Sequence, residues 1–381
     1  MCRCRKWVVF LVCLAVCVLM PMVCDASGAE MDLMLDKQLE MMDFGEVDAV
    51  IRGSSYGGVR GVDFPTLVGQ AVRGEVDLSP QGIGMSVLQS LFGEASALLS
   101  MMRHMILIAV LGAVFRELSA SFQRKAVSEL GFYAHYLVIL SILLSSFSMC
   151  VGLVQALSGE LCAFMMAAQP LLVGVVSIGG QPAAAFAFAP VLLAATNTVA
   201  FVVQEAIVPV ITLAAALQVV NYLSERPMLE KLSGLLRDGI RWALRGMAVL
   251  FVSVLSIQRM SAPAVQTAAA KTAKLAVNMV PVVGTALTDT VDSVMAWAGV
   301  ARSGVMVAAV VVLALMCAAP LLEMAAFVLI YKLTASLIQP VADARVVKVI
   351  DATGAFAGLL LGASALVAVM FIFMVMIVLS V

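Results

Sequence analysis

The chain has 381 residues, of which 63% are hydrophobic and 12% are charged, and its mean hydropathy is +1.07. A soluble globular domain is about half apolar and a quarter charged, so this composition excludes one and indicates a membrane protein with several spans. The net charge is -1, and no Lys/Arg run with interleaved aromatic residues occurs. Without a basic surface for a phosphate backbone, nucleic-acid binding is excluded as well.

Residues 1–29 have the layout of a secretory signal peptide. Arg3, Arg5 and Lys6 precede an apolar stretch that ends near Val23, and small residues follow up to Ala29. An uncleaved membrane anchor is the alternative. Most of the 8 cysteines lie in this leader, and the others lie in or beside apolar segments. Their spacing predicts neither a disulfide framework nor a metal site.

Residues 30–98 are the only long stretch with a water-compatible composition. Acidic residues interleave with leucine, methionine and valine between positions 32 and 48, which predicts one or two acidic amphipathic helices. Ser79 and Pro80 then have the preferences of a helix N-cap and first turn. We expect an external acidic segment that either lies at the membrane interface or forms a small docking module.

Residues 99–381 form the predicted transmembrane domain. A helix needs about 20 apolar residues to cross a hydrocarbon core, which predicts about 8 spans after the signal peptide. The candidate spans are residues 99–118, 132–157, 161–179, 183–203, 206–223, 240–258, 304–330 and 353–380. The expected fold class is therefore all-α, a polytopic membrane helical bundle. Most basic residues fall in loops that are inside if the mature N-terminus is outside, as the positive-inside rule requires.

Residues 261–302 form a polar-striped stretch between apolar segments, and the hinge residues Pro281 and Gly284 divide it into two short helices. In each half the polar side chains share one helix face. Folding the stretch at the hinge places Lys271 opposite Asp292, Lys274 opposite Asp289 and Asn278 opposite Thr285. A re-entrant hairpin with paired charges and an amphipathic pair lying on the outer surface both fit this pattern.

Two further features lie in the last apolar segments. Glu323 follows Pro320 in an apolar run, where an ionisable side chain marks a pathway or a buried partner. A hydrogen bond to carbonyls freed by Pro320, or an ion pair with Lys332, is the structural alternative. Glycines that repeat every four residues predict a face for close helix packing, within the chain or between subunits of a homo-oligomer. These are Gly354, Gly358 and Gly362.

The sequence lacks the motifs of an enzyme. His104 and His135 are its 2 histidines, and neither belongs to a ligand motif. Phosphate-binding loops, His-Glu-x-x-His and Gly-x-Ser-x-Gly are absent. We expect no catalytic residue, no cofactor and no metal, so that energy for any movement comes from a partner or a gradient.

Five groups of residues occur in a characteristic order along the apolar part of the chain. They are Ser177-Ile-Gly-Gly with Ala185-Phe-x-x-x-Pro190, Ser256-Ile-Gln258, Thr272-Ala-Lys274 through Pro281-Val-Val-Gly284, Thr288-Asp289-Thr-Val-Asp292, and Leu329-Ile-Tyr-Lys332 through Gln339-Pro340. Together with the leader, the acidic segment and the spans, they resemble the stage III sporulation protein AE family of endospore-forming bacteria. Shared composition alone does not produce such long collinear matches.

This resemblance implies a component of the channel or secretion complex that connects the mother cell and the forespore. The protein would lie in the bilayer of the mother-cell-derived membrane around the forespore, with its N-terminal segment on the external, intermembrane side. Its partners would be the other membrane proteins of the stage III sporulation A locus and stage II sporulation protein Q.

Two functions fit this resemblance. In the first, the protein is a transporter-like conduit subunit. In the second, it is a non-conducting membrane scaffold that assembles the other components. The residues that would line the conduit or pair in the hairpin are Lys271, Lys274, Asn278, Asp289, Asp292 and Glu323.

Overall fold

The computed structural model describes residues 44–54, 63–73, 98–115, 117–118, 125–178, 194, 197–223, 231–251, 253 and 283–380. Nearly all of these residues are helical, and none of them forms a β-strand. The elements are α3 (Gly45–Gly53), α4 (Phe64–Arg73), the helix Leu98–Phe115, α6 (Lys125–Ile178), η1 (Val202–Ile207), α8 (Val208–Leu223), helix 231–251, α10 (Val283–Ile338) and α11 (Ala344–Ser380). The predicted all-α fold class is confirmed, whereas the signal peptide lies outside the described residues.

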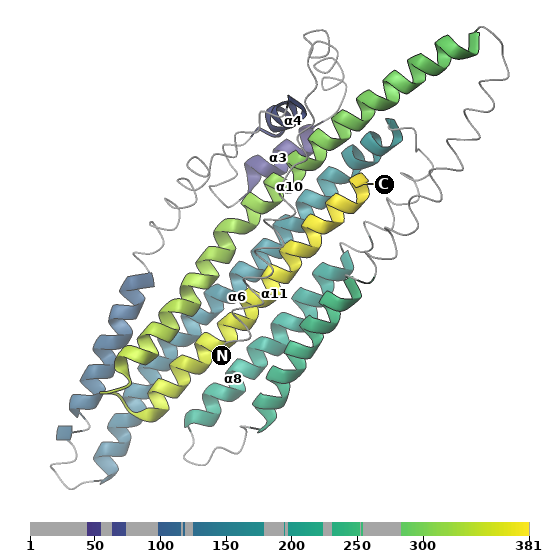
Figure 1. The fold of residues 1–381 in the computed structure, drawn as a ribbon. Helices are drawn as coiled ribbons and strands as arrows, with labels where there is room; N and C mark the ends of the chain where they lie inside the picture. The colour runs from purple at the N-terminus through teal and green to yellow at the C-terminus, as the bar shows by residue number, and fades with distance from the viewer. Residues whose placement is uncertain are drawn as a thin grey trace.

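Three long helices, α6, α10 and α11, form the centre of the bundle (Figure 1). A short turn after α10 reverses the chain, so α10 and α11 pack as an antiparallel hairpin and α6 lies along both. Large side chains on these helices are fully buried, among them Phe164, Phe327, Phe356 and Phe371. In a bilayer, such close packing replaces the hydrophobic effect as the force that holds helices together.

Five described helices are long and apolar enough to cross a membrane. They are Leu98–Phe115, Gly131–Val175, Asn197–Tyr222, Arg302–Ile338 and Ala344–Met376. The predicted breaks between spans at residues 158–160 and 204–205 are wrong, because the first lies inside α6 and the second inside η1. Neither break contains the prolines or extended polar runs that end a helix. The count of about 8 spans, reached with the length criterion, is therefore not confirmed.

The helix α10 is also longer than the sequence suggests. Val283–Ile338 is one continuous helix of 56 residues, about 84 Å at 1.5 Å per residue. It passes through Pro320 and contains the second half of the polar stretch 261–302 without a break near residue 302. Figure 1 shows its first part extending beyond the ends of α6 and α11.

Two short amphipathic helices from the N-terminal segment pack against the bundle. Ile51 of α3 and Phe64 and Val68 of α4 are fully buried. The first helix contacts α6 and the second contacts α10. Ser54, just after α3, donates a hydrogen bond of 2.7 Å to the Glu160 carboxylate. This bond gives the carboxylate within α6 a polar partner from the N-terminal segment.

Asp63 caps the start of α4. The Thr66 hydroxyl donates to Asp63 Oδ2 at 2.6 Å, and the backbone N–H of Leu67 donates to the Asp63 carbonyl at 3.1 Å. Arg52 of α3 also approaches the Asp63 carboxylate at 3.2 Å. The Thr66 hydrogen bond, helped by the Arg52 charge, holds the pKa of Asp63 below its ordinary value.

Candidate functional site

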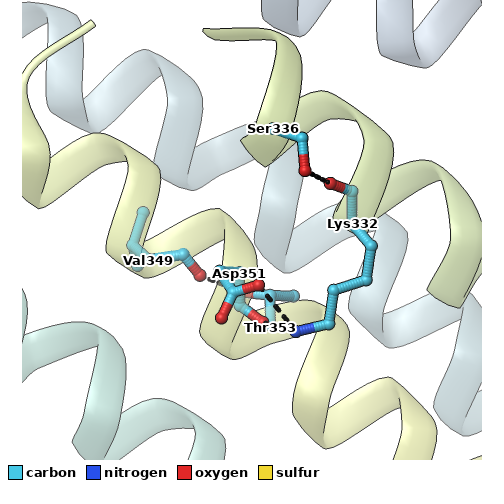
Figure 2. Close-up of polar contacts among 5 residues, drawn as sticks. All are labelled: Lys332, Ser336, Val349, Asp351 and Thr353. Atoms are coloured by element: carbon cyan, nitrogen blue, oxygen red, sulfur yellow. Dashed lines mark hydrogen bonds and ion pairs between the residues drawn. The ribbon is translucent and has the colours of Figure 1, made fainter. Parts of the chain in front are cut away.

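Lys332 of α10 and Asp351 of α11 form an ion pair close to the turn between the two helices (Figure 2). Lys332 Nζ lies 2.6 Å from Asp351 Oδ1 and also donates to the Asp351 carbonyl at 3.3 Å. Their side chains are 37% and 55% exposed, so the pair lies at the surface of the bundle. The sequence suggested Glu323 as a partner of Lys332, but Lys332 pairs with Asp351 instead.

One residue earlier, Tyr331 joins α10 to α6. Its hydroxyl donates to Ser146 Oγ at 2.7 Å, and Ser146 in turn donates to the Ile142 carbonyl at 2.8 Å. Tyr331 and Ser146 are both buried. A buried hydroxyl needs a hydrogen-bond partner, so this chain of bonds ties the two helices at one register. The sequence analysis missed Ser146, although the family-like group ending at Lys332 contains Tyr331.

The three glycines of α11 have different surroundings. A Cβ at Gly354 would lie 2.8 Å from Tyr331 Cβ, so the close approach of α10 requires glycine here. A Cβ at Gly358 would lie 4.0 Å from the Val328 side chain, in ordinary contact, and one at Gly362 would meet nothing within 4 Å. The packing role therefore falls mainly on Gly354, and its partner is in the same chain.

Glu323 is an acidic residue of α10 with an intermediate degree of burial. It follows Pro320 by one turn. The position places a partly buried acidic side chain in the membrane-crossing part of α10. Charged groups at such depth mark pathways or structural partners.

The remaining predicted residues are only partly described. Lys271, Lys274, Asn278 and the hinge residue Pro281 lie outside the described residues, and so does the proposed pairing. Gly284, Asp289 and Asp292 belong to the first turns of α10, where the backbone is described but the side chains are not.

The end of the bundle at the α10–α11 turn carries a second set of contacts that the sequence did not reveal. The Arg345 guanidinium lies over the Phe132 ring of α6, 3.7 Å from its centroid. Asp343 accepts a hydrogen bond of 2.9 Å from the Arg345 backbone N–H and caps α11. Tyr136 donates to the Val219 carbonyl of α8 at 3.0 Å. These bonds hold α6, α8 and α11 together at one end.

Within the described residues, no group of three or more His, Cys, Asp or Glu side chains is placed to hold a metal ion. The free cysteines described there, Cys150, Cys162 and Cys317, lie on two different helices and are at least partly buried.

Comparisons with known proteins agree with the resemblance seen in the sequence. A family model described as Stage III sporulation protein AE matches residues 62–381. Stage III sporulation protein AE of Bacillus subtilis (strain 168) is 28% identical over 320 residues, which cover 84% of this chain and 80% of the relative. No solved structure matches the chain. The matched region contains α4 and every later helix, so the chain belongs to the stage III sporulation protein AE family.

Proposed function

We propose that this membrane protein is a subunit of the complex connecting the mother cell and the forespore, and that it forms part of a conduit there. Membership of a sporulation family and the helices able to cross a membrane support its place in a sporulation membrane. It would lie in the mother-cell-derived membrane beside the other proteins of the stage III sporulation A locus and stage II sporulation protein Q. Its role is non-enzymatic in this proposal.

The reach of α10 is the observation that carries the proposal. The part of α10 that can cross a membrane is Arg302–Ile338, and residues 283–301 continue the same helix for about 28 Å. This extension, here called the arm, projects past the other long helices (Figure 1). A subunit of a complex between two membranes needs such a projection to meet partners outside its own bilayer.

The charges support an orientation with the arm on the external side. Lys332, Arg345 and Lys348 lie near the α10–α11 turn, at the opposite end of the bundle from the arm. Basic residues favour the cytoplasmic side. The N-terminal helices pack higher on the bundle, where α4 contacts Gly304 near the base of the arm. The proposal thus keeps a signal peptide at 1–29, an external segment at 30–98 and a transmembrane domain at 99–381.

Cysteine labelling tests this orientation in intact non-sporulating cells that express the protein, where the side called external faces the medium. A cysteine at Ala342 in the turn should react only after the membrane is permeabilised, whereas one at Gly53 should react with an impermeant reagent from outside. The reverse pattern would overturn the orientation and would place the arm in the cytoplasm.

The conduit itself is tested with cysteines along residues 267–292. If this stretch lines a water-filled path, small aqueous reagents should label positions with a helical period. If Lys274 pairs with Asp289, then Lys274→Asp and Asp289→Lys should each impair sporulation and the double exchange should restore it. A double exchange that restores nothing would argue against the hairpin.

The non-conducting scaffold is the second candidate. It is favoured by the closely packed α6–α10–α11 core, in which each of the three helices contacts the other two and Phe327 is fully buried. Uniform protection of residues 267–292 from aqueous reagents, together with loss of partner proteins when α10 is altered, would support the scaffold over the conduit.

A further inference from the structure

Helix 231–251 lies lengthwise beside α11. The Arg237 guanidinium carbon is 5.3 Å from the centroid of the Phe356 ring. Near the other end, the rings of Phe251 and Phe373 are 6.3 Å apart. Both α11 residues belong to the membrane-crossing part Ala344–Met376. Helix 231–251 is not among the five described helices that are long and apolar enough to cross a membrane, but this packing places the residues between Arg237 and Phe251 beside the membrane-crossing part of α11.

Arg245 lies near the middle of the stretch between Arg237 and Phe251. It is about 12 Å beyond Arg237 along its helix, and Phe356 is about 7.5 Å beyond Asp351 along α11. Arg245 is thus about 20 Å from the Lys332–Asp351 pair, along a hydrocarbon core of about 30 Å. A long basic side chain can extend to the lipid headgroups only from near a helix end. Arg245 is too far from the headgroups for its guanidinium to reach them in this way.

Glu205 lies at a similar depth on the neighbouring helix. The Ser233 hydroxyl donates to Gln218 of α8, which sets the register of two segments that run side by side (Figure 1). Arg245 is about 18 Å beyond Ser233, and Glu205 is about 20 Å before Gln218, so both positions lie at nearly one level. Both side chains are exposed.

The backbone around Glu205 is unusual. It belongs to the π-helix η1, where the Val208 N–H donates to the Val203 carbonyl five residues back, and Pro209 follows directly. Single π-turns inside longer helices are frequent at functional sites. Here the turn carries an acidic side chain on the outside of the bundle.

An exposed charge inside a bilayer is costly, and charges of both signs on one surface make that surface self-complementary. In the part of the chain that the structure describes, neither Arg245 nor Glu205 has an ion pair. Helix 231–251 also exposes a large apolar face, with Leu235, Trp242 and Leu250 each about 70% exposed in this structure. Tryptophan and arginine are enriched at the centres of protein–protein interfaces.

We propose that helix 231–251 and the adjoining η1–α8 segment form an interface between copies of this chain in the membrane. In this interface Arg245 of one copy pairs with Glu205 of a second copy. The inference does not depend on conduction, because a conduit ring and a scaffold would both use it.

Disulfide trapping between two differently tagged full-length copies tests the pairing. One copy carries Glu205→Cys and the other carries Arg245→Cys, and oxidised membranes are examined for a band with both tags. The matched control replaces Glu205→Cys by Leu322→Cys, which is 40% exposed on α10 and lies about 15 Å from Lys332 along that helix, within about 5 Å of the level of Arg245. The proposed pair should give at least about tenfold more mixed disulfide than the control, the ratio expected for about 1.4 kcal/mol. Equal yields would overturn the interface.

Charge exchange gives an independent readout. Arg245→Glu or Glu205→Arg alone should reduce co-purification of the two tags about tenfold, and the double variant should restore it. Co-purification yields are divided by the amount of inserted protein, measured on immunoblots of membranes. If a charge variant fails to accumulate, the disulfide experiment still tests the interface. A double variant that restores nothing would overturn the pairing.

The same cysteine variants show whether this surface instead faces water or lipid. If Arg245→Cys reacts with a water-soluble charged thiol reagent and forms no mixed disulfide, the surface faces water. If it neither reacts nor crosslinks, the surface faces lipid. Either result would refute an interface between copies.

Discussion

Replacing Gly354 by alanine probes the closest approach between α10 and α11. The added Cβ would lie 2.8 Å from Tyr331 Cβ, well inside van der Waals contact. Tyr331 is fully buried and bonded through its hydroxyl to Ser146 at 2.7 Å, so it cannot move away without disturbing that bond.

The size of the effect follows from three contributions. Overpacking costs about 1–3 kcal/mol, and loss of the Tyr331 hydrogen bond costs about 1 kcal/mol. Alanine in place of glycine inside a helix contributes about 1 kcal/mol in the opposite direction. We therefore expect Gly354→Ala to lower the free energy of unfolding by about 1–3 kcal/mol.

Thermal unfolding of the purified full-length protein in detergent measures this loss. Gly362→Ala is the matched control, because a Cβ there meets nothing within 4 Å. The control should match or exceed the parent Tm, since it adds helix propensity without a clash. The Gly354→Ala protein should unfold several degrees lower. Equal Tm values for the two variants would refute the close approach of Tyr331 to Gly354.

Three more predictions concern the ends of the bundle. A leucine at Gly304 would overlap the Val72 side chain, so Gly304→Leu should release α4 and speed proteolysis of the N-terminal segment; an unchanged rate would contradict the docking. Lys332→Glu should cost only about 0–1 kcal/mol because its pair with Asp351 is exposed, and adding Asp351→Lys should restore the Tm. The lowered pKa of Asp63 stabilises the start of α4 above its unfolded pKa of about 3.9, and this stabilisation disappears as the pH falls through the lower folded value. Protease sensitivity of α4 should therefore rise only below about pH 4, and Asp63→Asn, which keeps a capping oxygen, should remove that dependence.

Local patterns predicted helices better than they predicted where helices end. Ser158-Gly159-Glu160 has the composition of a turn, yet α6 continues through it, and Ser54 from the N-terminal segment hydrogen-bonds the Glu160 carboxylate. Such a contact joins residues far apart in the sequence, and no local pattern contains it. The local pattern also fails to predict η1, where a π-turn before Pro209 keeps the chain helical across Gln204 and Glu205.

The candidate site shows the same division. The glycine repeat was visible in the sequence, but only the structure distinguishes the tightly packed Gly354 from the open Gly362. The charge of Lys332 was equally visible, and its partner proved to be Asp351 on the next helix. The sequence shows that an ionisable residue in an apolar region needs a partner. The identity of that partner depends on how helices far apart in the sequence pack.

The amino-acid sequence by itself determined the class of this protein and its family. A chain that is 63% hydrophobic with several long apolar runs must place helices in a membrane, because only helices satisfy their own backbone hydrogen bonds there. Collinear groups of residues such as Thr288–Asp292 carried the family resemblance. The tertiary structure alone decided that α6 and α10 each run unbroken, that Tyr331 bonds Ser146, and that Glu205 and Arg245 lie at one depth. Those features depend on the register between helices, which is set by packing over the whole bundle.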